Sequence, residues 1–169
     1  MSDQMVPPPP PPPPAGGGFD ANAALNDFKG ADPLDLAVVG AGVLALIFSF
    51  IGSYYTISGF GRSANIGSAW HGFFSWAGVL LLLAASAVVS AKIIKVQIPN
   101  AEIIGAATAV VGLLFTFLAL FVDAGNTGLL AGTGISEGRG WTYWIILILA
   151  LVSGGITGLK FAKARGFVK

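Results

Sequence analysis

Cysteine is absent from the 169-residue sequence, and histidine occurs only once, as His71. Without cysteine the chain can form no disulfide, no thiol nucleophile, no thiolate metal site and no palmitoylated anchor. A single imidazole with no nearby cluster of carboxylates cannot supply the four ligands of a tetrahedral zinc site. The sequence therefore predicts neither a metal nor another cofactor.

Charged residues are also scarce, at 10% of the sequence, whereas a typical soluble domain carries about 25%. Hydrophobic residues reach 54%, and the mean hydropathy is +0.79. Because so few polar groups cannot cover a water-soluble globule, we expect most of the surface to face a lipid bilayer. The formal net charge of +1, with no stripe of interleaved basic and aromatic residues, argues against a nucleic-acid partner.

Long apolar segments make up most of the remaining chain, at about 34–54, 70–91, 101–122 and 141–159. Each approaches the ~20 residues that an α-helix needs to cross a hydrocarbon core ~30 Å thick. The sequence thus predicts an all-α fold, in which residues 33–160 form a bundle of four transmembrane helices. The first segment follows a long proline-rich stretch and is too long for the apolar region of a signal peptide, so we expect no such signal.

Residues 1–32 have the composition of a disordered tail rich in proline and glycine. Pro7–Pro14 is an unbroken polyproline run, which at ~3.1 Å per residue forms a stiff rod roughly 25 Å long. We interpret this run as a rigid spacer in preference to a ligand for the aromatic-lined groove of another protein. If it is such a ligand, Pro7, Pro10 and Pro14 are the candidate partner-binding residues.

Two short segments flank the bundle. Phe19, Leu25 and Phe28 are spaced as in a short interfacial helix within the N-terminal tail. Residues 161–169 form a second, basic tail.

The distribution of basic residues predicts the orientation of the chain. Seven of the nine Lys and Arg residues fall on one side of the predicted bundle: Lys29, Lys92, Lys95, Lys160, Lys163, Arg165 and Lys169. Only Arg62 and Arg139 fall on the other side. By the positive-inside rule, we expect both tails to be cytoplasmic. We expect the membrane to be the plasma membrane.

Every Trp and Tyr of the chain falls near the opposite, outer ends of the predicted helices: Tyr54, Tyr55, Trp70, Trp76, Trp141, Tyr143 and Trp144. Amphipathic aromatic rings prefer the membrane interface, so we interpret these residues as an outer belt that anchors the helix ends. The alternative is an outward platform for a partner or a lipid.

Small residues recur at every fourth position on several predicted helices, as in Ala37, Ala41, Ala45, Gly105, Ala109, Gly154 and Gly158. Such faces let helix backbones approach closely in lipid, and we assign them to packing within one bundle. Gly154 and Gly158 are the best candidates for an additional contact between chains.

The interiors of the predicted spans carry no charge, since Asp35, Glu102 and Asp123 sit at the ends of their segments. This absence argues against ion-coupled transport by a monomer. His71 begins a helix beside a tryptophan, a place typical of an interfacial hydrogen-bonding residue. A catalytic role would require His71 to meet Asp123 at the outer interface.

Residues 59–64 match G-x-G-x-x-A, but this copy lies between two membrane helices rather than after a strand, so we interpret it as a turn. The glycine-rich segment 123–140 is expected to be a flexible loop.

Five segments carry a resemblance to known proteins: Pro7–Gly18, Asp32–Leu36, Ser53–Thr56, Ala69–Phe74 and Gly140–Trp144. Through them the chain resembles, over about residues 32–160, a group of small actinobacterial membrane proteins, some of them labelled antigenic proteins. The resemblance implies four helices, a cytoplasmic tail rich in proline and glycine, and involvement with envelope or cell-division assemblies. It implies no functional residues.

We therefore expect a non-enzymatic accessory or scaffold subunit of a plasma-membrane assembly. Its expected partners are the bilayer, another membrane protein or a second copy, and a cytoplasmic protein bound through the tail. The alternative is a homo-oligomeric pore or carrier for a small solute, assembled through Gly154 and Gly158.

Overall fold

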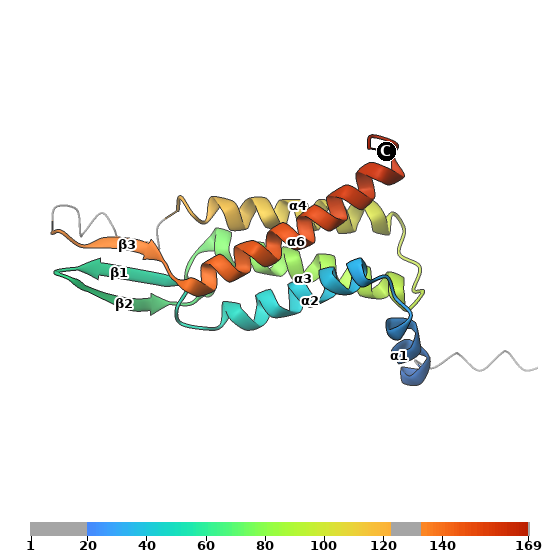
Figure 1. Cartoon of the computed structure of the whole chain (residues 1–169), viewed down its shortest axis with the longest axis horizontal. Helices are drawn as coiled ribbons and strands as arrows, with labels where there is room; N and C mark the ends of the chain where they lie inside the picture. Colours follow the sequence, from blue (N-terminus) through green and yellow to red (C-terminus); the bar gives the residue numbers. More distant parts are fainter. Residues whose placement is uncertain (1–19, 123–132, 169) are drawn as a thin grey trace, which may run out of the picture.

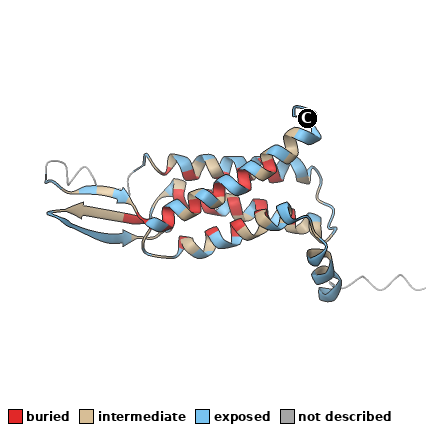
Figure 2. Ribbon diagram, in the orientation of Figure 1, coloured by how far each residue is buried: buried red, intermediate tan, exposed pale blue. Residues whose placement is uncertain are grey.

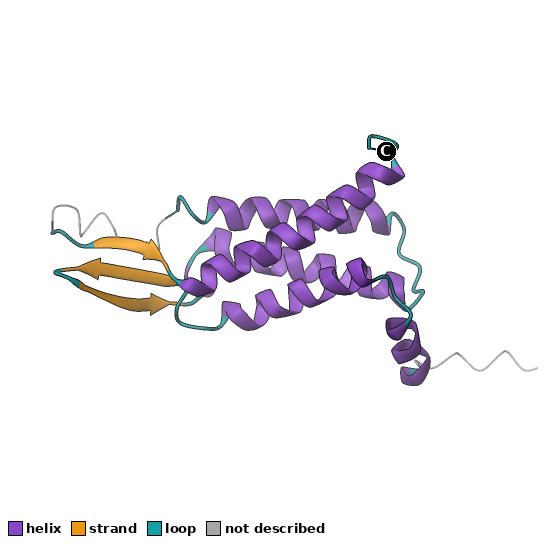
Figure 3. Cartoon of the chain, viewed as in Figure 1, coloured by secondary structure: helices purple, strands orange, loops and turns teal. Residues whose placement is uncertain are grey.

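The computed structural model describes residues 20–122 and 133–168, and the chain is mostly helical (Figure 3). The helices are α1 (Ala21–Lys29), α2 (Pro33–Ser49), α3 (Phe73–Ile93), α4 (Ala101–Leu118) and α6 (Trp141–Ala164), with a 3-10 turn η1 (Ala69–His71). The strands are β1 (Tyr55–Gly59), β2 (Arg62–Gly67) and β3 (Ser136–Arg139). The polyproline run Pro7–Pro14 and Asp123 lie outside the described residues.

Helices α2, α3, α4 and α6 form a ring in which each helix packs against its two neighbours (Figure 1). The pairs are α2–α3, α3–α4, α4–α6 and α6–α2. By length and composition, α3, α4 and α6 can each cross a membrane. The shorter α2, of 17 residues, follows α1 at a bend of 115°, and the two together pass the same test. The expectation of several membrane-length apolar helices is confirmed.

The helix boundaries differ from those predicted. The first helix ends at Ser49 instead of about residue 54, because the chain turns there toward β1. The last helix continues to Ala164, so the first four residues of the predicted basic tail 161–169 extend α6 instead of following it. Residues 21–29 of the predicted disordered tail form α1, where the Asp20 carboxylate accepts hydrogen bonds from Asn22 N and Ala23 N and so caps the helix.

The helices are apolar on the outside and partly polar within. Large side chains such as Ile47, Leu114, Phe117 and Ile148 are exposed on the ring's outer surface. The buried faces, coloured red in Figure 2, carry small residues and hydroxyls. The buried hydroxyl-bearing residues other than tyrosine are Ser49, Ser75, Ser86, Thr116, Thr142, Ser153 and Thr157. This arrangement suits apolar surroundings, because the exposed side chains are those whose contact with water is least favourable in free energy.

Glycines set the closest helix approaches. A Cβ atom on Gly42 of α2 would lie 2.0 Å from Ser86 Oγ and 2.7 Å from the Leu82 carbonyl oxygen of α3. Gly78 of α3 and Gly112 of α4 face each other, and a Cβ on either would lie 3.2 Å from the other's carbonyl oxygen. At these points two backbones meet with no room for a side chain.

The predicted packing residues lie largely where the sequence placed them. Ala41, Ala45, Gly105, Ala109 and Gly154 are buried, and Ala37 and Gly158 are half-buried. A Cβ on Gly154 would lie 3.1 Å from Leu113 Cδ2 of α4, whereas one on Gly158 would lie 3.9 Å from Val110 Cγ2. Gly154 is therefore used inside the chain, which argues against the predicted contact between chains at this residue.

A three-stranded antiparallel sheet of order β2-β1-β3 projects from one end of the ring, and the all-α prediction missed it. Strands β1 and β2 form a hairpin in which Gly59 pairs with Arg62 across the two-residue turn Phe60-Gly61. Both turn residues have positive φ, at 52° and 76°, as a type I′ turn requires. The segment matching G-x-G-x-x-A is thus a hairpin turn with its flanking strands.

Candidate functional site

The two ends of the helix ring differ in charge. We call them the sheet end, from which the strands project, and the basal end, where α1 and the end of α6 lie (Figure 1). Eight of the nine Lys and Arg residues are described, and six of these eight belong to the basal end: Lys29, Lys92, Lys95, Lys160, Lys163 and Arg165. Arg62 and Arg139 belong to the sheet.

The three tyrosines pack inside the sheet end and do not form the outer belt that the sequence predicted. Tyr54 and Tyr143 are fully buried and Tyr55 is 2% exposed. The Tyr54 ring centroid lies 4.9 Å from that of Tyr55 and 5.4 Å from that of Tyr143, both edge-on. With Arg139 and Ser75 they form what we call the outer junction, which joins the sheet to the helices.

The tyrosine hydroxyls of the outer junction differ in their hydrogen bonding: Tyr55 has a partner and Tyr54 has none among the described residues. Tyr55 Oη lies 2.7 Å from Ser75 Oγ of α3. A Cβ on Gly72, which precedes α3, would lie only 2.1 Å from Tyr55 Oη, so glycine there makes room for the phenol. The Tyr54 hydroxyl has no hydrogen-bond partner among the described residues. Burial raises the pKa of Tyr54 far above its ordinary value, because desolvation disfavours the phenolate.

Arg139, the last residue of β3, connects three elements. Its guanidinium carbon lies 4.6 Å from the centroid of the Tyr55 ring. One guanidinium nitrogen donates hydrogen bonds to the carbonyl oxygens of Ala119 and Val122, which follow α4. These carbonyls belong to a helix C-terminus, where a cation is favourable. Arg139 thus holds the sheet, the end of α4 and the tyrosine cluster in one arrangement.

The tryptophans remain on the outside at the sheet end. Trp70, Trp141 and Trp144 are exposed and Trp76 is half-buried, so the predicted anchoring belt is reduced to these four residues. Trp70 Nε1 donates a 3.1 Å hydrogen bond to Ser49 Oγ at the end of α2.

The hairpin tip carries the most exposed large hydrophobic residue of the described chain. Phe60 is 87% exposed and has a positive φ, which is unfavourable for a bulky residue. Type I′ turns favour asparagine or glycine at this position. Strand β2 is an edge strand whose first five residues are all exposed.

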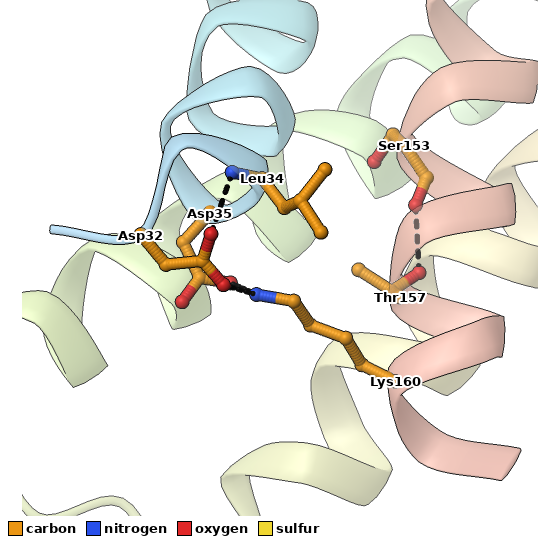
Figure 4. A network of polar contacts seen from close by, with 6 residues as sticks. All are labelled: Asp32, Leu34, Asp35, Ser153, Thr157 and Lys160. Atoms are coloured by element: carbon orange, nitrogen blue, oxygen red, sulfur yellow. Dashed lines mark hydrogen bonds and ion pairs between the residues drawn. The ribbon is translucent and has the colours of Figure 1, made fainter. Parts of the chain in front are cut away.

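Ion pairs join α1 and α2 to neighbouring segments at the basal end. Lys160 of α6 reaches Asp32 at 2.6 Å and Asp35 at 2.7 Å, as Figure 4 shows. Lys95 pairs with Asp27 of α1 at 2.6 Å. The Lys160 ammonium and the Leu34 N–H both donate to the Asp32 carboxylate and lower the pKa of Asp32. Lys95, which follows α3, thus contacts α1, and Lys160 of α6 contacts the start of α2.

A cavity of about 60 Å³ opens beside these ion pairs, and we call it the basal pocket. All four ring helices contribute to it. Its charged lining residues are Asp35, Lys92, Glu102 and Lys160, and its apolar walls include Val88, Val89, Ala106 and Phe161. The sequence placed Asp35 and Glu102 at helix ends but gave no sign that they share a pocket.

The residues considered for catalysis do not form a described site. His71 lies in η1 with its Nδ1 3.2 Å from the Ser68 carbonyl oxygen, a local contact. Asp123 lies outside the described residues, so their proposed meeting stays a prediction. Within residues 20–122 and 133–168, no group of three or more His, Asp or Glu residues could hold a metal ion.

Comparisons with protein-family models, with curated proteins and with solved structures find no match for this chain. The resemblance to small actinobacterial membrane proteins therefore stays an expectation, and the function must be inferred from the geometry of the two ends.

Proposed function

We propose that the chain is a non-enzymatic accessory subunit of a plasma-membrane assembly, which crosses the bilayer four times and presents its sheet on the outer side. The apolar outer surface of the ring and the basic basal end support this orientation. At about 1.5 Å per residue, the 17 residues of α2 span about 25 Å, near the lower limit for a transmembrane helix. The sharp bend before α2 favours α1 lying along the cytoplasmic interface.

This orientation gives a testable labelling pattern. Because the chain has no cysteine, single cysteines can be introduced without background. Ser63→Cys in β2 is expected to react with a membrane-impermeant maleimide in intact cells, and Ala164→Cys at the end of α6 only after permeabilisation. Both residues are exposed, so accessibility within the fold does not limit either reaction. The reverse pattern would place the sheet in the cytoplasm and refute the proposed topology.

The proposal of a partner outside the membrane rests on the tip of the β1–β2 hairpin. A phenylalanine at a left-handed turn position costs stability and, at 87% exposure, buries little of its ring in return. Such conflicts between a residue and its local conformation are expected at functional sites. A rigid sheet, held by Arg139 and the tyrosines, thus presents Phe60 to a hydrophobic recess on another protein.

We predict that Phe60→Asn stabilises the hairpin while weakening partner binding. Asparagine suits the first position of a type I′ turn, so amide hydrogen exchange in β1 and β2 is expected to become slower. The opening free energy that it reports should rise by about 0.5–1 kcal/mol. Extraction in native membrane patches followed by mass spectrometry should recover less of the bound partner. Phe121→Asn is the matched control, since Phe121 is 68% exposed at the end of α4 but is not part of the hairpin. Equal partner recovery from Phe60→Asn and the wild type would remove the hairpin tip from the proposal.

The cytoplasmic side contributes a second expected contact. The polyproline run precedes α1, which is linked to the basal end of the ring through the Lys95–Asp27 ion pair. Pro7, Pro10 and Pro14 remain candidate partner-binding residues there. The alternative of a homo-oligomeric pore gains no support from Gly154, because Leu113 of the same chain already packs against it.

A further inference from the structure

The basal pocket lies at the depth of lipid headgroups if the ring crosses a bilayer as proposed. Lys92 is in the last turn of α3, while Asp35 and Glu102 are in the first turns of α2 and α4. Lys160 is one turn before the end of α6. All four charged lining residues therefore sit at the ends of their helices, on the same side of the ring.

The pocket walls change from charged to apolar with depth. Val88 and Val89 lie about one turn inward from Lys92, and Gly105 and Ala106 about one turn inward from Glu102. Thr157 similarly lies one turn inward from Lys160 on α6, as Figure 4 shows. A molecule with a charged end and an apolar continuation would match both zones.

The charges of the lining residues are balanced: Asp35 and Glu102 against Lys92 and Lys160. Lys160 already pairs with Asp32 and Asp35. Lys92 and Glu102 form no ion pair or side-chain hydrogen bond within the described part of the chain, although the charge of Lys92 also acts on the Asp32 carboxylate. One available cation and one available anion therefore remain at the rim of the same cavity.

We propose that the basal pocket binds the headgroup of a zwitterionic phospholipid with a primary ammonium, of the phosphoethanolamine type. Lys92 binds the phosphate, Glu102 accepts hydrogen bonds from the ammonium, and the apolar wall takes the start of an acyl chain. An anionic headgroup would meet the two carboxylates, and a purely cationic one would meet the two lysines. This inference rests on the proposed membrane insertion but not on any partner protein.

The test is lipid retention by the full-length protein in nanodiscs made from equal parts phosphatidylethanolamine, phosphatidylcholine and phosphatidylglycerol with matched acyl chains. After release into the gas phase, mass spectrometry identifies the lipid that stays bound. We expect about tenfold preference for phosphatidylethanolamine over phosphatidylcholine, because a quaternary ammonium cannot donate hydrogen bonds to Glu102. Glu102→Gln should abolish this preference, and Lys92→Gln should weaken retention of all three lipids.

Lys163→Gln is the control, because it removes one exposed positive charge at the basal end from a residue outside the pocket. Both Lys92 and Glu102 are also exposed, so their variants are expected to fold. Equal retention of the three lipids, or a preference for phosphatidylglycerol that Glu102→Gln strengthens, would overturn the proposal while leaving membrane insertion intact. Displacement of the lipid by soluble glycerophosphoethanolamine at similar concentration would show that the ligand is a water-soluble phosphodiester, and would overturn the lipid as the source.

Discussion

Gly42→Ala is expected to destabilise the helix ring by about 3 kcal/mol, near the upper end of the usual cost of overpacking a core. The added Cβ would lie 2.0 Å from Ser86 Oγ and 2.7 Å from the Leu82 carbonyl oxygen, so α2 must move away from α3. That movement would also break the 2.9 Å hydrogen bond from Ser86 Oγ to the Val38 carbonyl oxygen. Reversible unfolding in mixed detergent micelles measures the loss.

The matched control lies two residues earlier on the same helix. A Cβ on Gly40 would meet no atom within 4 Å, so Gly40→Ala adds only helix propensity and is expected to raise stability by about 0.5–1 kcal/mol. Adding Ser86→Gly to Gly42→Ala removes the contact at Ser86 but not the one at Leu82, so recovery should be partial. Equal effects of the two glycine substitutions would show that α2 and α3 do not meet at Gly42.

The membrane-length helices could be predicted from the sequence because hydropathy is a local property. The residues at which the helices end could be predicted less well from the sequence. Residues 50–54 are apolar and extend the first hydrophobic run, yet they lead to the outer junction instead of continuing α2. Gly42 was missed as a contact because the regular spacing of Ala37, Ala41 and Ala45 describes a helix face but not the point on it where another backbone comes closest.

The sheet and the outer junction depend on contacts between distant segments. The sequence Ser-Glu-Gly-Arg of β3 has little strand propensity, and it is extended because β1 offers it hydrogen bonds, with Tyr55 paired to Arg139. That pairing covers the tyrosines. A tyrosine near a helix end has the same local sequence whether it faces lipid or lies under a sheet, so the belt prediction failed for Tyr54, Tyr55 and Tyr143. For the four tryptophans it stays a prediction.

The basal pocket was hidden for a similar reason. Asp35 and Lys160 are 125 residues apart and meet only because α2 and α6 are neighbours in the ring. The sequence could show that charges gather at helix ends, where they avoid the hydrocarbon core, but not which of them face a common cavity. Knowing the order of helices around the ring would have been enough to suggest this pair.

Arg139→Ala is expected to detach the sheet from the helices and to cost about 3.5 kcal/mol, the sum of its contacts at the lower end of their usual ranges. Hydrogen bonds from a charged donor contribute about 1.5–3 kcal/mol each, and a partly exposed cation–π contact adds about 0.5–1 kcal/mol. The substitution leaves the carbonyl oxygens of Ala119 and Val122 without this donor and uncovers the Tyr55 ring. Amide hydrogen exchange should become faster across β1 and β3, while the middle turns of α3 and α4 keep their protection.

Arg139→Lys separates the charge from the shape of the side chain. Lysine keeps the positive charge but lacks the planar guanidinium that stacks on Tyr55 while donating to two carbonyls, so we expect it to restore less than half of the lost stability. Arg62→Ala is the control, because Arg62 is the other sheet arginine and is exposed beside the hairpin turn. If Arg62→Ala accelerates exchange in β1 and β3 as much as Arg139→Ala does, the sheet is held by its own pairing. If only Arg139→Ala does so, the orientation of Phe60 depends on this one side chain, and Arg139→Ala should reduce partner recovery as Phe60→Asn does.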